Sequence, residues 1–360
     1  KKRDAFFRQR YRKRHACYLP FFLLRQRNIF PQSGENRVIP PHKVMPFCKQ
    51  SFTFYKEAPE FMAVVVPVLC FFLSSLLSLL FLRLSPVLGA IDPPDGVRKL
   101  HRAPTPRLGG MAIFSSFFLF SLLFLPKTVG VLSLLFGGVI LVFSGFLDDT
   151  RTLAAGEKLL FQCLAAAGAL ALFGVPSDLR FLSSALTLPI PLATGFFFLF
   201  LVAAPNAVNF SDGADGLAAG CVLPSLLGLS LLFFSHGESV PAGCALLLFF
   251  ALLGFLPFNR APAGLFMGDA GSQFLGFATA FLTFSDGRFS PSRLLFLALP
   301  LTDLCVTVGG RILRGKNPFR ADRGHLHHRL AAQGASTGEI VLVASALSSA
   351  AAMLGVSLSL

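Results

Sequence analysis

The chain of 360 residues is 54% hydrophobic and only 14% charged. Its apolar residues come in long blocks rather than in stripes of helical period, which excludes an ordinary water-soluble globular domain. The formal net charge of +14 would suit nucleic-acid binding, but fourteen Lys and Arg against four Asp and Glu precede Met62, and eighteen against fourteen follow it. No nucleic-acid partner is therefore expected for the apolar part.

Residues 1–61 are rich in Arg, Lys, Phe and Pro and show neither helical nor strand periodicity. This composition predicts a basic, disordered extension. A basic arm for anionic lipid or nucleic acid is the functional alternative. Met62 leads directly into the first apolar block, so we expect natural translation to begin at or near Met62, with residues 62–360 forming one membrane-embedded domain.

A membrane-spanning helix needs roughly 20 apolar residues, because unpaired backbone groups cannot be hydrated in hydrocarbon. The sequence after Met62 contains about ten such stretches. We therefore predict an all-α polytopic integral membrane protein with about ten transmembrane helices. The predicted spans are 62–83, 110–126, 129–147, 158–174, 190–205, 217–235, 241–257, 271–284, 294–312 and 339–357.

Alternating spans place the loops 84–109, 148–157, 206–216, 258–270 and 313–338 on one side of the membrane. These loops and the helix ends beside them carry most Lys and Arg that follow Met62, whereas the other side has Lys127, Arg180, Arg288 and Arg293. The positive-inside rule makes the first side cytoplasmic. The same side collects acids and imidazoles, which predicts cytoplasmic catalytic loops: Asp148, Asp149, Asp212, Asp215, Asp269, His325, His327 and His328.

Three of these carboxylates occur at the ends of apolar spans. Asp148 and Asp149 close one span, and Asp269 stands between glycines just before another. Oxygen ligands of this kind suit Mg²⁺ or Mn²⁺, and a carboxylate can also act as a base. Each motif alone is equally typical of a solvated helix end or a helix N-cap.

Two further segments are rich in polar groups. Asn206 to Gly216 holds two amides, two carboxylates and two glycines, a mixture suited to a nucleotide and a hard cation. Residues 316–328 combine Lys and Arg with three histidines, and diphosphate is the natural ligand of such a surface. Zinc is the alternative, although no Cys or Glu lies near these histidines and no CxxC motif occurs.

Asp303 lies inside the ninth predicted span. An ionisable side chain at membrane depth is expected to be functional or paired. Arg311, about two turns further along the helix, is the candidate partner.

The order of these motifs resembles that of the polyprenyl-phosphate N-acetylhexosamine-1-phosphate transferases, over essentially the whole chain after Met62. The His-x-His-His form at 325–328 is similar to the branch that uses UDP-N-acetylglucosamine. The stretches that carry the resemblance are 92–110, 147–149 with Lys158 and Gln162, 206–216, 258–259 with 266–272, and 318–319 with 325–328.

This resemblance implies transfer of a HexNAc-1-phosphate, foremost GlcNAc-1-phosphate, from UDP-HexNAc to undecaprenyl or another polyprenyl phosphate, with release of UMP. It implies Mg²⁺ dependence, with Mn²⁺ as the alternative ion, and the first membrane step of cell-envelope polysaccharide synthesis. The lipid bilayer is the expected environment, as a multi-pass protein of the bacterial inner membrane, and a homodimer is the expected assembly. A UDP-MurNAc-pentapeptide phosphotransferase and, from a different class, a polytopic transporter are the alternatives.

The resemblance also implies roles for individual residues. Asp148, Asp149 and Asp269 would be catalytic and metal-binding, with Asp148 or Asp149 activating the acceptor phosphate. The remaining polar groups would bind the nucleotide, the diphosphate and the sugar: Lys158, Asn206, Asn209, Asp212, Asp215, Arg320, Arg323, His325, His327 and His328.

Overall fold

A computed structural model describes residues 64–94, 103–176, 178–181, 184–316 and 324–360. All of these lie within one compact unit. The expected extension at 1–61 and the expected ligands Arg320 and Arg323 lie outside the described residues.

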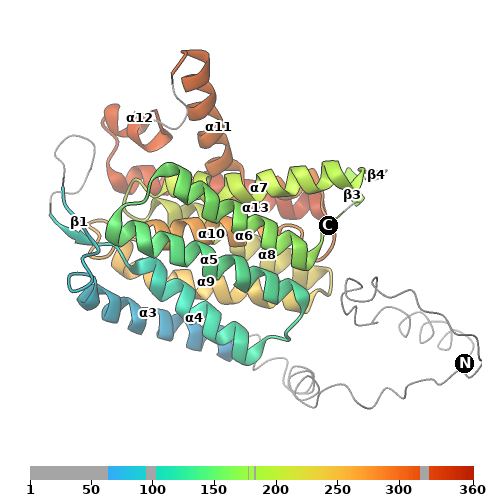
Figure 1. The fold of residues 1–360 in the computed structure, drawn as a ribbon, viewed down its shortest axis with the longest axis horizontal. Coiled ribbons are helices and arrows are strands. Elements are labelled where there is room, and N and C mark those ends of the chain that lie inside the picture. The colour runs from blue at the N-terminus through green and yellow to red at the C-terminus, as the bar shows by residue number, and fades with distance from the viewer. Residues whose placement is uncertain (1–63, 95–102, 177, 182–183, 317–323) are drawn as a thin grey trace, which may run out of the picture. The chain divides into compact units, whose positions relative to one another are not determined.

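The described part of the chain is built from long apolar helices that run side by side (Figure 1). Within the described residues, eight helices, with η4 and α11 counted together, are long and apolar enough to cross a membrane, and α4 is a shorter apolar helix. The predicted all-α polytopic fold is confirmed. The helices are α3 (Val66–Leu84), α4 (Gly109–Phe124), α5 (Val129–Arg151), α6 (Ala155–Phe173), α7 (Ile190–Ser211), α8 (Leu217–Ser235), α9 (Ser239–Asn259), α10 (Gly268–Leu282), the 3-10 helix η4 (Pro291–Leu297), α11 (Ala298–Leu313), α12 (Leu326–Ala332) and α13 (Thr337–Ser359).

Two helices continue beyond their predicted spans. α5 extends through Asp148 and Asp149, and α7 passes Pro205 and extends through Asn209 to Ser211. Hydropathy marks only the part of a helix that lies in hydrocarbon, whereas backbone hydrogen bonds carry the helix past that depth. The polar motifs expected in loops therefore lie largely on the rigid ends of helices.

The ninth predicted span is broken rather than straight. The 3-10 helix η4 ends at Leu297, whose φ of −124° and ψ of 17° interrupt the helical path before α11 begins. Figure 1 shows α11 leaving the bundle at a steep angle to the long axes of α5, α7 and α9. Asp303 consequently lies on a helix that points away from the bundle axis.

Helix α10 lies at the centre of the bundle, with all fifteen of its residues buried. It packs against α4, α5 and α7. The contact with α5 is close at Gly145, where an added Cβ would lie 2.2 Å from the backbone of Ala270. This close approach brings the end of α5 against the start of α10.

Two short antiparallel hairpins complete the described structure. Strands β1 (Ile91–Asp92) and β2 (Thr105–Pro106) pair with each other, and the backbone N–H of Phe266 donates to the Pro106 carbonyl at 2.7 Å. This contact places the chain that follows β2 beside the start of α10. The other hairpin, β3 (Asp178–Phe181) and β4 (Ser184–Thr187), joins α6 to α7.

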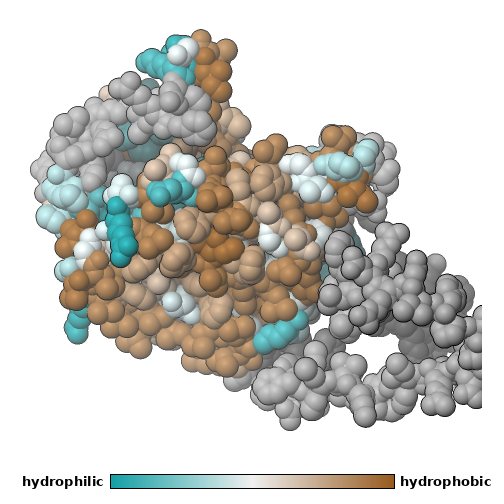
Figure 2. Space-filling view, viewed as in Figure 1, coloured by the Kyte–Doolittle hydropathy of each residue, from teal (hydrophilic) through white to brown (hydrophobic). Residues whose placement is uncertain are grey.

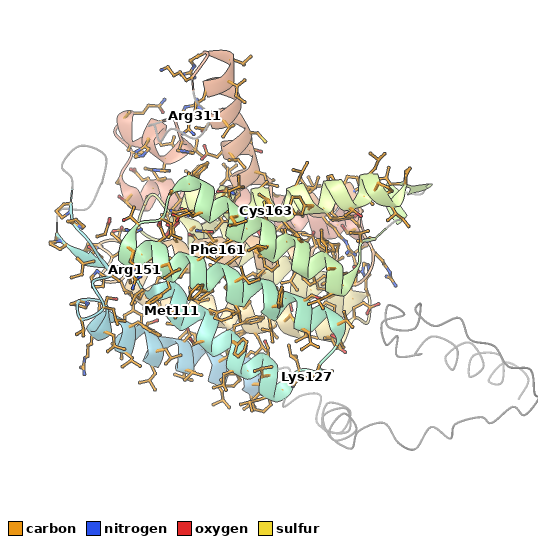
Figure 3. The ribbon with its side chains drawn as sticks, in the orientation of Figure 1. Met111, Lys127, Arg151, Phe161, Cys163 and Arg311 are labelled. Atoms are coloured by element: carbon orange, nitrogen blue, oxygen red, sulfur yellow. The ribbon has the colours of Figure 1, made fainter. Side chains whose placement is uncertain are left out.

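The outer surface of the bundle is predominantly apolar, as Figure 2 shows for one face. Large apolar side chains on its outward faces are exposed, among them Leu123, Phe143 and Leu199. Polar groups gather at the ends of the helices, and in Figure 3 Lys127 and Arg151 lie at opposite ends of the stretch that contains α5. This distribution is that of a multi-pass membrane protein.

Replacing Gly145 with Ala should destabilise the protein by about 1–3 kcal/mol, because the new methyl group would overlap the backbone of α10. Thermal unfolding in detergent would measure the loss. Gly195→Ala on α7 is the matched control, since no atom lies within 4 Å of its added Cβ. Equal stability of the two variants would contradict the close packing of α5 on α10.

Candidate active site

Three buried carboxylates meet where α5 ends and α10 begins. Asp148 and Asp149 come from the last turn of α5, and Asp269 is the second residue of α10. One oxygen of each lies within 4.8 Å of the others. Like charges at this separation repel strongly in a buried environment, so the arrangement requires cations.

Two basic side chains contact this carboxylate cluster. Lys158, on the first turns of α6, places Nζ 2.7 Å from Asp148 Oδ2 and 2.8 Å from Asp269 Oδ2. Arg107 Nη2 lies 3.2 Å from Asp149 Oδ1 and 3.8 Å from Asp269 Oδ1. Among the described residues, two cations therefore face three carboxylates, an imbalance that favours a further cation.

Arg107 is anchored by a fourth carboxylate. Its Nη1 lies 3.3 Å from Asp92 Oδ1, on the neighbouring strand β1. Burial alone would lower the pKa of Arg107, but the carboxylates of Asp149, Asp92 and Asp269 outweigh that effect and raise it. The guanidinium therefore stays charged and bridges the β1–β2 hairpin to the carboxylate cluster.

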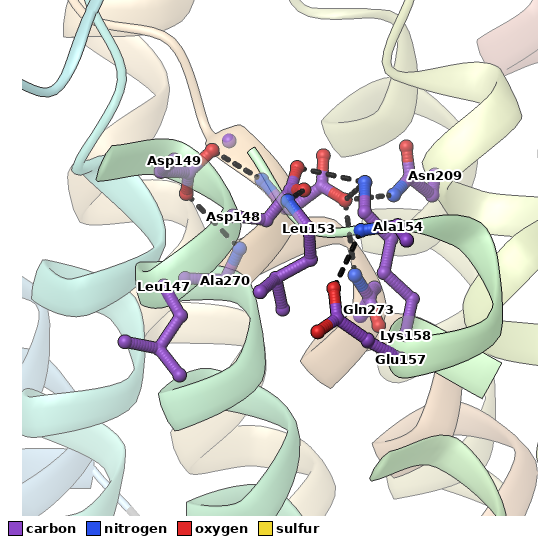
Figure 4. A network of polar contacts seen from close by, with 12 residues as sticks. Leu147, Asp148, Asp149, Leu153, Ala154, Glu157, Lys158, Asn209, Ala270 and Gln273 are labelled. Atoms are coloured by element: carbon purple, nitrogen blue, oxygen red, sulfur yellow. Dashed lines mark hydrogen bonds and ion pairs between the residues drawn. The ribbon is translucent and has the colours of Figure 1, made fainter. Parts of the chain in front are cut away.

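Asp149 also binds the N-terminus of α10. Its carboxylate accepts hydrogen bonds from the backbone N–H of Asp269 at 3.0 Å and of Ala270 at 3.3 Å; Figure 4 shows these contacts of Asp149 beside Ala270. A carboxylate at this position satisfies unpaired N–H groups and interacts favourably with the helix dipole. The interaction sets the position of Asp269 relative to α5.

A chain of amides orients Asp269 from the side of the bundle core. Asn209 Nδ2 and Gln273 Nε2 donate to Asp269 Oδ2 at 2.9 Å and 3.0 Å. Gln162 donates to Gln273 at 3.1 Å, and Asn206 donates to Gln162 at 2.7 Å. Asn206 therefore supports the site indirectly through Gln162.

Asp212 and Asp215 occupy different surroundings just after α7. Loss of hydration, together with the carboxylates of Asp269 and Asp149, raises the pKa of Asp212 well above its ordinary value. Asp215 instead accepts a hydrogen bond from the backbone N–H of Ala263 at 2.9 Å. Asp215 thus ties two loops together, whereas Asp212 lies close enough to the carboxylates of Asp269 and Asp149 for its protonated form to be favoured.

The segment that contains His327 packs against the loop that follows α7. His327 is 3% exposed, and its Nε2 has no hydrogen-bond partner among the residues that the structure describes. A Cβ added to Gly213 would lie 2.3 Å from that nitrogen, so the imidazole lies directly against the segment between Asn206 and Gly216. His328 contacts His327 with ring centroids 4.2 Å apart. Two segments that the sequence predicted as ligand-binding are therefore adjacent.

Three residues that contact this site were not predicted as site residues. Arg107, Gln162 and Gln273 all contribute, although Arg107 and Gln162 occur in stretches that carry the family resemblance. Gln273 follows Asp269 by four residues on a helix, and that spacing puts both side chains on one face. The spacing was the available signal for Gln273.

The expected pairing of Asp303 with Arg311 takes a different form. Asp303 Oδ2 lies 2.9 Å from His325 Nδ1, and Arg311 Nη2 lies 3.4 Å from the other ring nitrogen of His325. The histidine therefore stands between the two charged groups.

Comparison with known proteins places the chain in a family. Residues 131–285, from α5 to just beyond α10, match glycosyl transferase family 4. The "Probable undecaprenyl-phosphate N-acetylglucosaminyl 1-phosphate transferase" of Bacillus subtilis (strain 168) is 33% identical over 301 residues, covering 78% of this chain and 81% of the relative. The chain belongs to glycosyl transferase family 4.

Other members of the family are similarly close. The decaprenyl-phosphate N-acetylglucosaminephosphotransferase of Mycobacterium tuberculosis (strain CDC 1551 / Oshkosh) is 33% identical over 295 residues, which cover 71% of this chain and 72% of the relative. The undecaprenyl-phosphate alpha-N-acetylglucosaminyl 1-phosphate transferase of Escherichia coli (strain K12) is 28% identical over 311 residues, with 82% and 84% covered. The family predicted from the order of motifs is confirmed.

Within this family member, Lys158 should be important for stability as well as for the site. Lys158→Met would leave Asp148 and Asp269 facing each other without their shared cation, so we expect the free energy of unfolding to fall by roughly 3 kcal/mol. Thermal unfolding with a chelator present would measure the change. Lys158→Arg, which keeps the charge, should lose much less, and equal losses would argue against a charge effect.

Proposed function

We propose that this protein transfers GlcNAc-1-phosphate from UDP-N-acetylglucosamine to undecaprenyl phosphate or a related polyprenyl phosphate, and releases UMP. The observation that carries the proposal is the cluster of Asp148, Asp149 and Asp269 with Lys158 and Arg107 at one end of a membrane-spanning bundle. The names of the relatives support the polyprenyl phosphate and the N-acetylglucosamine. They do not favour a UDP-MurNAc-pentapeptide transferase or a transporter.

We propose that Asp148, Asp149 and Asp269 hold Mg²⁺, with Mn²⁺ as an alternative ion. Their buried oxygens within 4.8 Å of one another form an all-oxygen donor set, which hard divalent cations prefer. The excess of carboxylates over cations supports this fit. When bound, Mg²⁺ would neutralise charge on the phosphates and polarise the phosphorus that is attacked.

In the proposed reaction, an oxygen of the polyprenyl phosphate forms a bond to the sugar-linked phosphorus of UDP-N-acetylglucosamine. The bond from that phosphorus to the bridging oxygen breaks, and UMP leaves with the electron pair. Lys158 and Arg107 lie where they can offset the repulsion between the two anionic substrates. The amides of Asn209 and Gln273 keep Asp269 in position by donating to its Oδ2.

We further propose that the site faces the cytoplasm from the inner membrane of a bacterium. Arg107, Lys158 and Arg151 lie at the end of the bundle that holds the carboxylate cluster, whereas Lys127 lies at the other end of α5 (Figure 3). This asymmetry supports a cytoplasmic site by the positive-inside rule. The homodimer expected from the sequence stays a prediction.

Purified protein should release UMP from UDP-N-acetylglucosamine only when polyprenyl phosphate is added. Asp269→Asn should lower this rate at least about 100-fold, because it removes a charge at the centre of the site. Asp286→Asn is a suitable control, since Asp286 pairs with Arg293 outside this site. UMP release that does not depend on polyprenyl phosphate would refute the transferase proposal, and greater activity with UDP-MurNAc-pentapeptide would refute the donor.

Binding of the metal should be visible without turnover. Mg²⁺ at about 100 times its dissociation constant should stabilise the wild-type protein by roughly 2.7 kcal/mol. Asp148→Asn and Asp269→Asn should lose most of this stabilisation, while Asp286→Asn should keep it. A stabilisation that survives both site substitutions would place the ion elsewhere.

A further inference from the structure

The first turn of α12 is held by a carboxylate from another helix. Asp303, on α11, accepts from the backbone N–H of Leu326 at 2.8 Å, and its other oxygen lies 2.9 Å from His325 Nδ1. His325 is the N-cap residue of α12, and no hydrogen bond from its own side chain caps the helix. Asp303 thus supplies the acceptor that a helix of seven residues needs at its start.

The partners of His325 determine its tautomer. A guanidinium can only donate hydrogen bonds, so His325 Nε2, 3.4 Å from Arg311 Nη2, must be the accepting nitrogen. A carboxylate can only accept, so Nδ1 carries the proton toward Asp303. Both ring nitrogens of His325 are therefore engaged within the protein, Nδ1 as a donor and Nε2 as an acceptor.

His327 differs from His325 in this respect. Its Nε2 is buried, has no hydrogen-bond partner within the described part of the chain, and lies against Gly213. Burial, with the nearby imidazoles of His328 and His325, lowers the pKa of His327 to about 4. A buried polar atom without a partner is costly, and a substrate oxygen that accepted from Nε2–H would remove that cost.

We propose that Asp303 and His325 are positioning residues, and that they hold α12 so that Nε2 of His327 donates to a phosphate oxygen of the substrate. The identity of that substrate rests on the proposed function. The tautomer of His325 and the capping by Asp303 do not depend on it.

A matched pair of substitutions separates the two histidines. Asn at 325 keeps a donor near the place of Nδ1 and can still bind Asp303, so His325→Asn should retain kcat/KM for UDP-N-acetylglucosamine within about fivefold. His327→Asn removes Nε2 and should lose about 10–100-fold, the usual effect of one hydrogen bond to a charged group. Equal losses, or a larger loss at 325, would overturn the proposal.

A double substitution tests whether Asp303 acts through His325. Asp303→Asn replaces one of the two accepting oxygens with an NH2 group, so either His325 Nδ1–H or the backbone N–H of Leu326 loses its acceptor, and we expect kcat/KM to fall about tenfold. An Asn at 325 can turn its amide and accept from that NH2 group, so Asp303→Asn combined with His325→Asn should recover to within about fivefold of wild type. A double variant no better than Asp303→Asn alone would show that Asp303 acts independently of His325.

Stability measurements distinguish positioning from general support of the fold. Asp286→Asn breaks another buried carboxylate interaction, with Arg293, and should lower the thermal midpoint without changing kcat of the folded protein. Asp303→Asn should change kcat/KM in protein that remains folded. If Asp303→Asn lowered only the thermal midpoint, its role would be structural and the proposal would fail.

Nitrogen-15 NMR of histidine-labelled protein provides a test that needs no turnover. The signals missing from His325→Asn identify His325, and they should show the neutral Nδ1–H tautomer at pH 7 in the wild type but not in Asp303→Asn. A charged ring or the Nε2–H tautomer would overturn the proposal even in an active enzyme. The expected tautomer in a protein that releases no UMP would uphold the positioning and refute only the proposed function.

Discussion

The main constraint on this structure is the repulsion among three carboxylates that are buried at one end of a membrane-spanning bundle. Asp148, Asp149 and Asp269 lie within 4.8 Å of one another, and the protein offsets their charge only in part. Lys158 and Arg107 supply two positive charges, and the N-terminus of α10 supplies partial ones. The surrounding helices serve to hold this unfavourable cluster in a fixed geometry, which is the property that a cation site for phosphate chemistry requires.

Hydropathy was sufficient to predict the long apolar helices of the described part of the chain, because the need to satisfy backbone groups in lipid leaves few alternatives. The break before α11 could not be predicted, since residues 294–312 are as apolar as a straight span. The ends of α5 and α7 were placed too early for a related reason. Polar residues such as Asp149 and Asn209 end a hydropathic block without ending a helix.

The sequence identified the residues of the site more readily than the hydrogen bonds and ion pairs between them. The carboxylates and histidines stand out because charged groups are rare in this sequence, and the order of motifs identified the family. Contacts such as Gln273 with Asp269 depend on how helices pack, and Arg107 reaches Asp149 only because β2 runs beside the start of α10. Asp303 was recognised as unusual, but its partner His325 follows 22 residues later, beyond the end of α11 at Leu313.

The uninterrupted course of α5 has a consequence for how the protein responds to its lipid environment. Its 23 residues join Val129, at one end of the bundle, to the aspartates at the other without a flexible segment between. A bilayer thinner or thicker than the helix would be accommodated by tilting, and a rigid rod that tilts displaces its tip. A change of membrane thickness that tilted α5 relative to α10 would therefore move Asp148 and Asp149 relative to Asp269.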